Sequence, residues 1–268
     1  MKSFLFALLA LAFTAPSIAQ GQLGFEDDWT SVLRRIVQDD GLVAYDEASG
    51  PDFDRTLAAI ESFDPSRLTA DDEKLAFWIN AYNAKMVEAI AARPNARNLE
   101  EQNLFDELFK SPVTVAGMQV TLDQIEHVIL RRQDGPAALE ALAVREVTPL
   151  IHVGLNCAAV SCPPLRPKAF ESELVRRRLG LAMRYWVRSP RFVRTEGGAL
   201  VFSSLLDWFG TDFDGPTGAA GDFLATYLDR EAPEQGRMLR ALEGRTAAEI
   251  KALPNVRFEY DWTVARAE

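Results

Sequence analysis

Both cysteines of the chain and one of its two histidines fall within one short segment. This segment, 151–165, has the sequence IHVGLNCAAVSCPPL and contains His152, Cys157 and Cys162. The second histidine, His127, lies earlier in the chain, in the stretch LDQIEHVILRR. Such a grouping is compatible with a disulfide, with a metal site, or with a thiolate nucleophile served by a histidine base.

A disulfide between Cys157 and Cys162 is the simplest interpretation for an exported protein. The bond would close only a short loop, so its entropic contribution would be small. A helical path between the two residues would hold their Cα atoms too far apart, whereas a tight turn would permit the bond. The disulfide therefore stays open as an alternative.

A metal site would require every soft ligand of the chain, namely both histidines and both cysteines. Structural zinc sites usually contain ligand pairs at shorter spacing, which His152-x₄-Cys157-x₄-Cys162 matches only loosely. We therefore expect no metal ion and no cofactor.

A cysteine nucleophile needs a lowered pKa and a neighbouring group that can hold a proton. Cys157 follows a predicted strand and Asn156, at a loop where backbone amides can stabilise a thiolate or an oxyanion. His127 lies beside the apolar stripe of its helix, where a helix borders a cleft. His152 would face the same cleft or solvent, and a lone histidine on a strand is more often structural.

The stretch WINAYNA places Asn80 and Asn83 on one face of a predicted helix. Buried amides need hydrogen-bond partners, so these side chains would form hydrogen bonds with nearby backbone, such as the segment 151–165 that carries both cysteines, here called the cysteine loop. Alternatively, one of them orients an imidazole or donates to an oxyanion. The supporting or substrate-binding positions of the predicted site are Tyr82, Asn83, Glu126, His152, Asn156, Ser161 and Cys162.

Hydrophobic spacing predicts the elements that must position these residues. The expected helices span 25–36, 75–90, 122–132, 171–187, 204–213 and 222–230. Hairpins are expected at 113–121 and 191–203, with turns at Ala116-Gly117 and Gly197-Gly198, and strands at 149–155 and 256–262. Capping boxes at Thr69–Asp72 and Thr121–Gln124 would begin two of the helices. Because helices and short hairpins interleave without a βαβ rhythm, we expect one α+β domain over residues 20–268.

The first residues, MKSFLFALLALAFTAPSIAQ, have the features of a secretory signal peptide. A charge at Lys2 precedes an apolar run too short to span a bilayer, and Ser17 and Ala19 suit a signal peptidase. We expect residues 1–19 to be removed, leaving a periplasmic or secreted protein with no membrane anchoring. The net charge of -10 argues against nucleic acid as a partner.

Five motifs, in their order along the chain, resemble those of domain-of-unknown-function family 547. They are LAFWINAYNA (75–84), IEHVILR (125–131), IHVGLNCAAVSCPPL (151–165), LLDWFGTDF (205–213) and YDW (260–262). The resemblance implies an exported bacterial member of a family without an established activity. It also implies that Cys157 and His127 are shared with plant members while Cys162 and His152 are not, which favours a Cys157–His127 dyad. Histidine before cysteine would suit a permuted papain-like or transglutaminase-like fold by analogy.

The leading hypothesis is a periplasmic cysteine-dependent hydrolase or acyl transferase acting on an amide or thioester of envelope origin. Cys157 would attack the carbonyl, His127 would take and return the proton, and Asn80 or a loop amide would hold the oxyanion. The alternative is a non-enzymatic binding or scaffold domain with a Cys157–Cys162 disulfide. In either case the partner would be an envelope substrate or protein.

Overall fold

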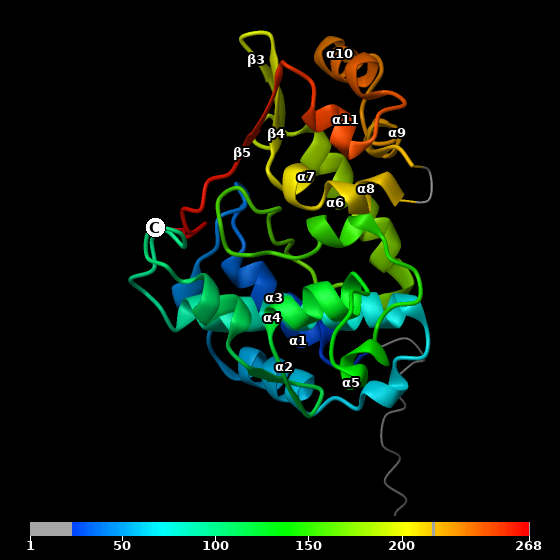
Figure 1. Cartoon of the computed structure of the whole chain (residues 1–268). Helices are drawn as coiled ribbons and strands as arrows, with labels where there is room; N and C mark the ends of the chain where they lie inside the picture. Colours follow the sequence, from blue (N-terminus) through cyan, green and yellow to red (C-terminus); the bar gives the residue numbers. More distant parts are fainter. Residues whose placement is uncertain (1–22, 216–217, 268) are drawn as a thin grey trace, which may run out of the picture.

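The computed structural model describes residues 23–215 and 218–267, so the predicted signal peptide lies outside the described residues. Helices alternate with two small sheets, which confirms the predicted α+β class. Figure 1 shows a lower part built from α1 to α5 and an upper part that begins with α6. The papain-like or transglutaminase-like arrangement stays a prediction.

The lower part is organised around one central helix, α3 (Asp71–Ala91). Every residue from Leu75 to Val87 is buried, as expected for a helix that is apolar on most of its faces. The predicted helices at 25–36 and 75–90 are confirmed, whereas α2 was not predicted. The other elements around α3 are α1 (Glu26–Ile36), η1 (Tyr45–Glu47), α2 (Pro51–Glu61), η2 (Pro65–Arg67), η3 (Asp106–Lys110) and α5 (Ala137–Glu140).

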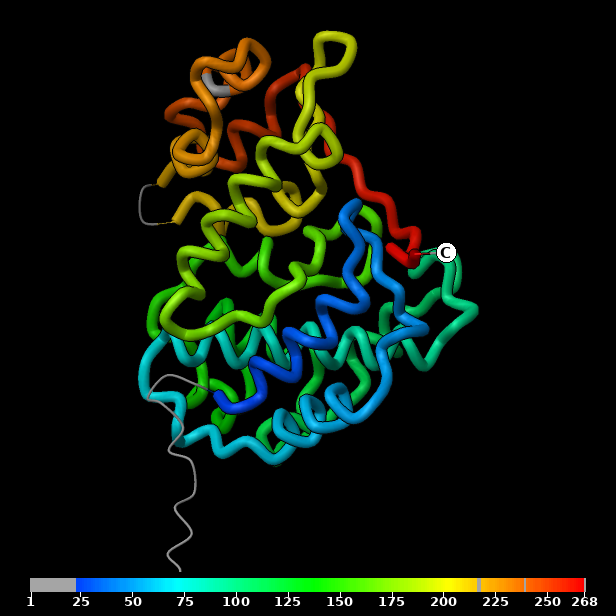
Figure 2. The backbone as a smooth tube through the Cα atoms, turned by 180° about the vertical axis from the view of Figure 1, so that it is seen from behind, coloured from blue at the N-terminus to red at the C-terminus, as the bar shows by residue number. Residues whose placement is uncertain are grey.

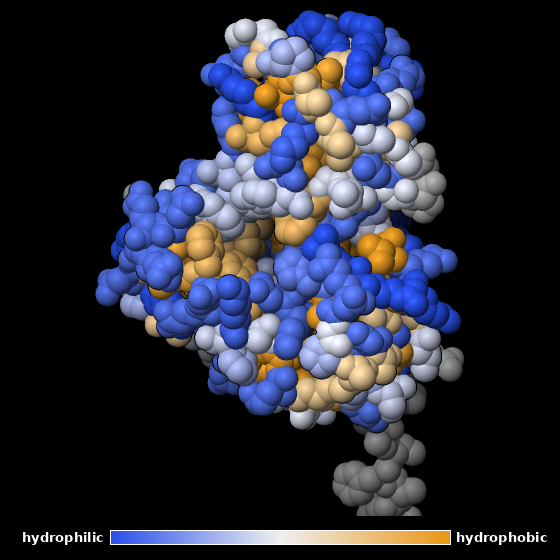
Figure 3. Space-filling view, viewed as in Figure 1, coloured by the Kyte–Doolittle hydropathy of each residue, from blue (hydrophilic) through white to orange (hydrophobic). Residues whose placement is uncertain are grey.

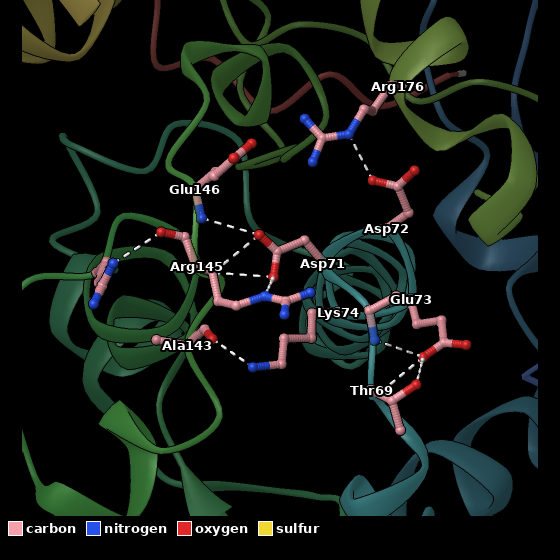
Figure 4. A network of polar contacts seen from close by, with 11 residues as sticks. Thr69, Asp71, Asp72, Glu73, Lys74, Ala143, Arg145, Glu146 and Arg176 are labelled. Carbon is pink, nitrogen blue, oxygen red and sulfur yellow. Dashed lines mark hydrogen bonds and ion pairs between the residues drawn. The ribbon is translucent and has the colours of Figure 1, made fainter. Parts of the chain in front are cut away.

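Glu73 caps the beginning of α3. Its carboxylate accepts hydrogen bonds from the backbone amides of Thr69 and Ala70, at 2.7 and 2.9 Å. The predicted capping box ended at Asp72 and is wrong, because the side chain that reaches back belongs to the third helical residue. Asp72 instead pairs with Arg176 of the upper part, as Figure 4 shows.

The loop before the cysteine segment is tied to the same end of α3 (Figure 4). The carboxylate of Asp71 accepts hydrogen bonds from the backbone amides of Arg145 and Glu146. Lys74 donates to the carbonyl of Ala143 at 2.6 Å. These contacts fix where the chain enters the segment that carries His152.

The predicted helix at 122–132 begins as expected and then widens. Thr121 and Gln124 form the predicted capping box, with reciprocal hydrogen bonds of 3.0 and 3.1 Å. After α4 (Leu122–Gln124) the chain forms a π-helix, η4 (Ile125–Leu130). Single π-helical turns are often found at functional sites, and this one carries Glu126 and His127.

The predicted strand at 149–155 is wrong, because the chain forms a 3₁₀-helix there, η5 (Pro149–Val153). Pro149 occupies its first turn, and the Thr148 hydroxyl accepts a hydrogen bond from the amide of Leu150. A short apolar run is compatible with either a strand or a helical turn, so periodicity could not separate the two. His152 consequently lies buried on a helical turn.

Both predicted hairpins are present, β1 (Val113–Val115) with β2 (Met118–Val120) and β3 (Val193–Glu196) with β4 (Ala199–Ser203). Their turn residues have positive φ, as two-residue hairpins require. The predicted C-terminal strand is β5 (Val256–Glu259), which pairs with β4 in parallel. The remaining helices are η6 (Ser172–Leu174), which precedes the upper part, and α6 (Val175–Arg188), α7 (Leu205–Trp208), α8 (Gly210–Asp214), α9 (Ala220–Ala225), α10 (Pro233–Leu242) and α11 (Ala247–Lys251) of the upper part, of which α10 and α11 were not predicted.

Residues 256–267, here called the closing segment, join the two parts of the molecule. The buried apolar residues form one cluster in the lower part and a second in the upper part. β5 extends the upper sheet, after which the segment pairs at single positions with Asn98, Ala159 and Val43. Figure 2 shows this red segment descending from the upper part to the N-terminal half of the chain.

Candidate functional site

A cavity of about 290 Å³ lies where the two parts and the closing segment meet. In the space-filling view a hollow with apolar, orange walls opens between the upper and lower parts (Figure 3). Predicted site residues from four elements reach it, and they are Tyr82, Glu126, His127, His152, Cys157 and Cys162. The structure therefore gathers both cysteines and both histidines around one space.

Cys157 presents its sulfur to the hydroxyl of Tyr260 at 3.1 Å. Burial raises the pKa of the Cys157 thiol, but hydrogen bonds from Cys162, Tyr260 and the amide of Ala159 outweigh burial and lower that pKa below its ordinary value. A thiol with a lowered pKa is the nucleophilic form of cysteine. No hydrogen bond joins Cys157 to either histidine in the described part of the chain.

Cys162 is the less acidic of the two sulfurs. It accepts a hydrogen bond from the amide of Cys157 at 2.8 Å and contacts the carbonyl of Leu155 at 3.7 Å. Burial and the neighbouring Cys157 raise the pKa of Cys162 well above its usual value. Both residues are free thiols in this structure, and their opposite pKa shifts make Cys157 the candidate nucleophile.

Buried asparagines hold the cysteine loop in place. The amide of Asn83 donates to the carbonyl of Gly154 at 2.8 Å, and its oxygen accepts from the amide of Asn156 at 2.8 Å. The side chain of Asn156 then binds Pro163 and Ala158, whose φ of 68° is in the left-handed region. This confirms the interpretation that Asn83 bonds the backbone of the cysteine loop.

Asn80 is not brought to the cavity. Its amide donates to the carbonyl of Phe170 at 2.8 Å and its oxygen accepts from the amide of the same residue at 3.0 Å. Both polar groups of the side chain are thus occupied, and the predicted oxyanion role finds no support in this position. Ser161 likewise lies outside the cavity, where it exchanges hydrogen bonds with Asp261 of the closing segment.

His152 is held by a carboxylate rather than by a cysteine. Its Nε2 lies 2.8 Å from Asp212, and its ring stacks on Phe209 with centroids 4.3 Å apart. Burial lowers the pKa of His152 more than Asp212 raises it. Asp212 also forms a two-pronged ion pair with Arg131, and these contacts overcome burial and lower the pKa of Asp212 to about 2.

His127 receives a hydrogen bond from Arg131, whose Nη1 lies 2.8 Å from its Nδ1. A guanidinium can only donate, so Nδ1 is unprotonated and the neutral ring carries its proton on Nε2. Burial and the charge of Arg131 lower the pKa of His127, which keeps the ring neutral. In this tautomer His127 is a hydrogen-bond donor rather than a proton acceptor at Nε2.

Glu126 is the other group at the cavity that can carry a proton. Its side chain is 15% exposed, and its carboxylate lies 3.9 Å from Nδ1 of His152. Burial raises the pKa of Glu126 to about 8, partly offset by the charge of Arg131. At neutral pH Glu126 is therefore mostly a carboxylic acid, with the pKa expected of an acid–base catalyst.

The partners that set these properties were not predicted from the sequence. Tyr260, Asp212 and Arg131 all lie in motifs that carried the family resemblance, yet no role was predicted for them. Their place in those motifs was the available signal. In the described part of the chain, no cluster of three or more His, Cys, Asp or Glu side chains is arranged to hold a metal ion. Among the same residues, no helix is long and apolar enough to cross a membrane.

Fold and site together define an α+β protein with a thiol of lowered pKa at an apolar cavity. Residues 65–187 match the model of the family described as "Protein of unknown function, DUF547". The predicted resemblance is confirmed over these residues, which include the first three motifs, whereas 205–213 and 260–262 lie beyond them. No curated protein and no solved structure matches the chain.

Proposed function

We propose that this protein is a cysteine-dependent hydrolase or acyl transferase that attacks a thioester or amide carbonyl with Cys157. The observation that carries the proposal is the lowered pKa of Cys157 at the wall of a cavity large enough for a substrate group. Nucleophilic cysteines need such a site, where hydrogen-bond donors stabilise the thiolate and a reactant can approach it. An export signal and an envelope substrate belong to the same proposal and rest on residues 1–19.

The proposed reaction begins when the thiolate of Cys157 forms a carbon–sulfur bond with the carbonyl carbon. The neutral ring of His127 donates its Nε2 proton as a hydrogen bond to the developing oxyanion. Glu126 gives its proton to the leaving thiol or amine, which departs and leaves an acyl thioester on Cys157. Water, deprotonated by the Glu126 carboxylate, then releases the acid, or an acceptor nucleophile takes the acyl group.

These roles differ from the dyad that the sequence suggested. His127 was expected to take the proton of Cys157, but the hydrogen bond from Arg131 favours a donor role instead. The proposal keeps His127 at the site and assigns proton transfer to Glu126. Asn80 has no part in it, because its amide is engaged by Phe170.

Alkylation of the two thiols across pH tests the proposal. We expect Cys157 to react with iodoacetamide with a midpoint below the roughly 8.5 of a free thiol, and Cys162 to react slowly. Tyr260→Phe removes one thiolate donor and should raise the Cys157 midpoint, while Cys162→Ser identifies the site of labelling. Intact mass after incubation with an S-acyl N-acetylcysteamine thioester should show the acyl group on Cys157.

Two results would overturn the proposal. The first is an ordinary midpoint for Cys157 that does not change in Tyr260→Phe. The second is a Cys157–Cys162 disulfide in freshly isolated protein that resists mild reductant, which would support the scaffold alternative.

A further inference from the structure

One wall of the cavity is a continuous surface of aromatic rings. Trp262 contacts Phe105 with centroids 4.6 Å apart, Tyr260 at 4.5 Å and Trp208 at 5.6 Å. These rings come from the lower part, the closing segment and α7. Because these rings already contact one another, a ligand ring cannot be sandwiched between them. A ligand would instead pack against their shared surface.

This aromatic wall is more exposed than core packing requires. Trp208 is 45% exposed, and Phe105 and Trp262 are only partly buried. Among the large apolar side chains that are exposed in the described residues, only Trp208 lines the cavity. Exposed apolar surface that continues into a cavity is typical of a binding site.

The charges around the cavity disfavour an anionic ligand. Asp123 and Glu126 are the acidic side chains on its surface. Lys110 also lines it, but the Lys110 ammonium pairs with Asp106 at 2.6 Å. Arg131 behind the cavity is paired with Asp212. An anionic ligand would therefore lie beside the carboxyl group of Asp123, and both Lys110 and Arg131 already have carboxylate partners.

The volume sets the size of the group that fits. A cavity of about 150 Å³ holds benzene, so about 290 Å³ suits a group of roughly a dozen non-hydrogen atoms. We propose that the cavity binds an uncharged apolar acyl group of this size, aromatic or aliphatic, against the wall formed by Trp208, Tyr260 and Trp262. This inference rests on the proposed function only for the position of the carbonyl at Cys157.

Binding to the Cys157→Ser variant separates recognition from chemistry. We would titrate it calorimetrically with S-acyl N-acetylcysteamine thioesters whose acyl groups are acetyl, octanoyl, 3-phenylpropanoyl or succinyl. We expect the octanoyl and phenylpropanoyl thioesters to bind at least about tenfold more tightly than the acetyl and succinyl ones, because they fill the apolar space. A difference between octanoyl and phenylpropanoyl would show whether the natural group is aliphatic or aromatic.

Variants of exposed aromatic residues provide the control. In the Cys157→Ser background, Trp208→Ala should weaken phenylpropanoyl binding about tenfold, and Trp208→Phe should restore most of it. Tyr185→Ala removes an exposed aromatic side chain from α6, outside the cavity, and should leave binding unchanged. Thermal unfolding of each variant verifies that it is folded.

The outcomes distinguish this inference from the proposed function. Equal binding of all four thioesters, or tightest binding of succinyl, would overturn the inference, even if the wild-type protein became acylated on Cys157. Selective binding of the apolar thioesters without acylation of the wild-type protein would support the inference and contradict the hydrolase or transferase.

Discussion

At the scale of single residues, the site contains two carboxyl groups on either side of His152 whose pKa values are shifted in opposite directions. Asp212 is held as a carboxylate by Arg131 and His152, whereas burial keeps Glu126 mostly protonated at neutral pH. When the pKa values of two acidic groups differ in this way, one group can act as a fixed charge and the other can carry a proton.

The proton affinity of Glu126 predicts a measurable dependence of stability on pH. Its pKa rises from 4.5 to about 8 on folding, so its contribution to stability is complete below pH 4.5 and is lost as pH rises through 8. Glu126→Gln should therefore be more stable relative to the wild type at pH 9 than at pH 5, by about 2 to 4 kcal/mol. Urea unfolding at the two pH values measures this difference.

The exposed Glu101→Gln serves as a matched control and should show no such difference. The same Glu126→Gln variant should lose about 10² to 10³ in the rate of acyl release from Cys157, as expected when a proton carrier is removed. An unchanged pH dependence of stability would contradict the raised pKa of Glu126.

At the scale of secondary-structure elements, the site depends on contacts that lock irregular segments to regular ones. The cysteine loop is held against α3 by Asn83, and the end of η4 is held against α8 by the ion pair between Arg131, which directly follows η4, and Asp212. At Gly154 a Cβ atom would lie 2.6 Å from Leu179, so glycine lets the cysteine loop pass closely under α6. The position of each functional group therefore reflects packing between elements.

Removing the Asn83 clamp should loosen the cysteine loop. Asn83→Ala leaves the carbonyl of Gly154 and the amide of Asn156 buried without partners, which should cost about 2 to 4 kcal/mol of unfolding free energy. The alkylation midpoint of Cys157 should shift toward the value of a free thiol, because the loop amides lose their alignment. Gln119→Ala, which removes an exposed side-chain hydrogen bond in the β1–β2 hairpin, should change neither quantity appreciably.

Breaking the link between η4 and α8 should cost more than breaking a surface pair. Asp212→Asn leaves the buried Arg131 without its counter-charge and should lower the unfolding free energy by about 2 to 4 kcal/mol at neutral pH. Asp106→Asn, which breaks an exposed pair with Lys110, should leave the unfolding free energy almost unchanged. Because the pKa of Asp212 is about 2 in the folded protein, its stabilisation is present above pH 4 and lost as pH falls toward 2, so the Asn penalty should shrink there.

At the scale of the whole molecule, sequence patterns predicted what depends on local order and missed what depends on distant contacts. The helix around Asn80 and the hairpin at Gly197-Gly198 follow from spacing and turn chemistry. The 3₁₀-helix that carries His152 could not be predicted, because a short apolar run fits a strand and a helical turn equally well. The hydrogen bond between Tyr260 and Cys157 joins residues that are 103 positions apart, and no local sequence pattern can predict such a contact.

The closing segment also determines when the Cys157 thiol acquires its lowered pKa. Tyr260 lies on this segment, and all the other groups that set the pKa of Cys157 precede it in the chain. During synthesis both cysteines therefore emerge long before Tyr260, whose hydroxyl lies against Cys157. Until the closing segment docks, the pKa of the Cys157 thiol stays higher than in the folded protein. The Cys157 thiol would therefore stay less reactive in the nascent chain and gain its full reactivity only once the closing segment has docked.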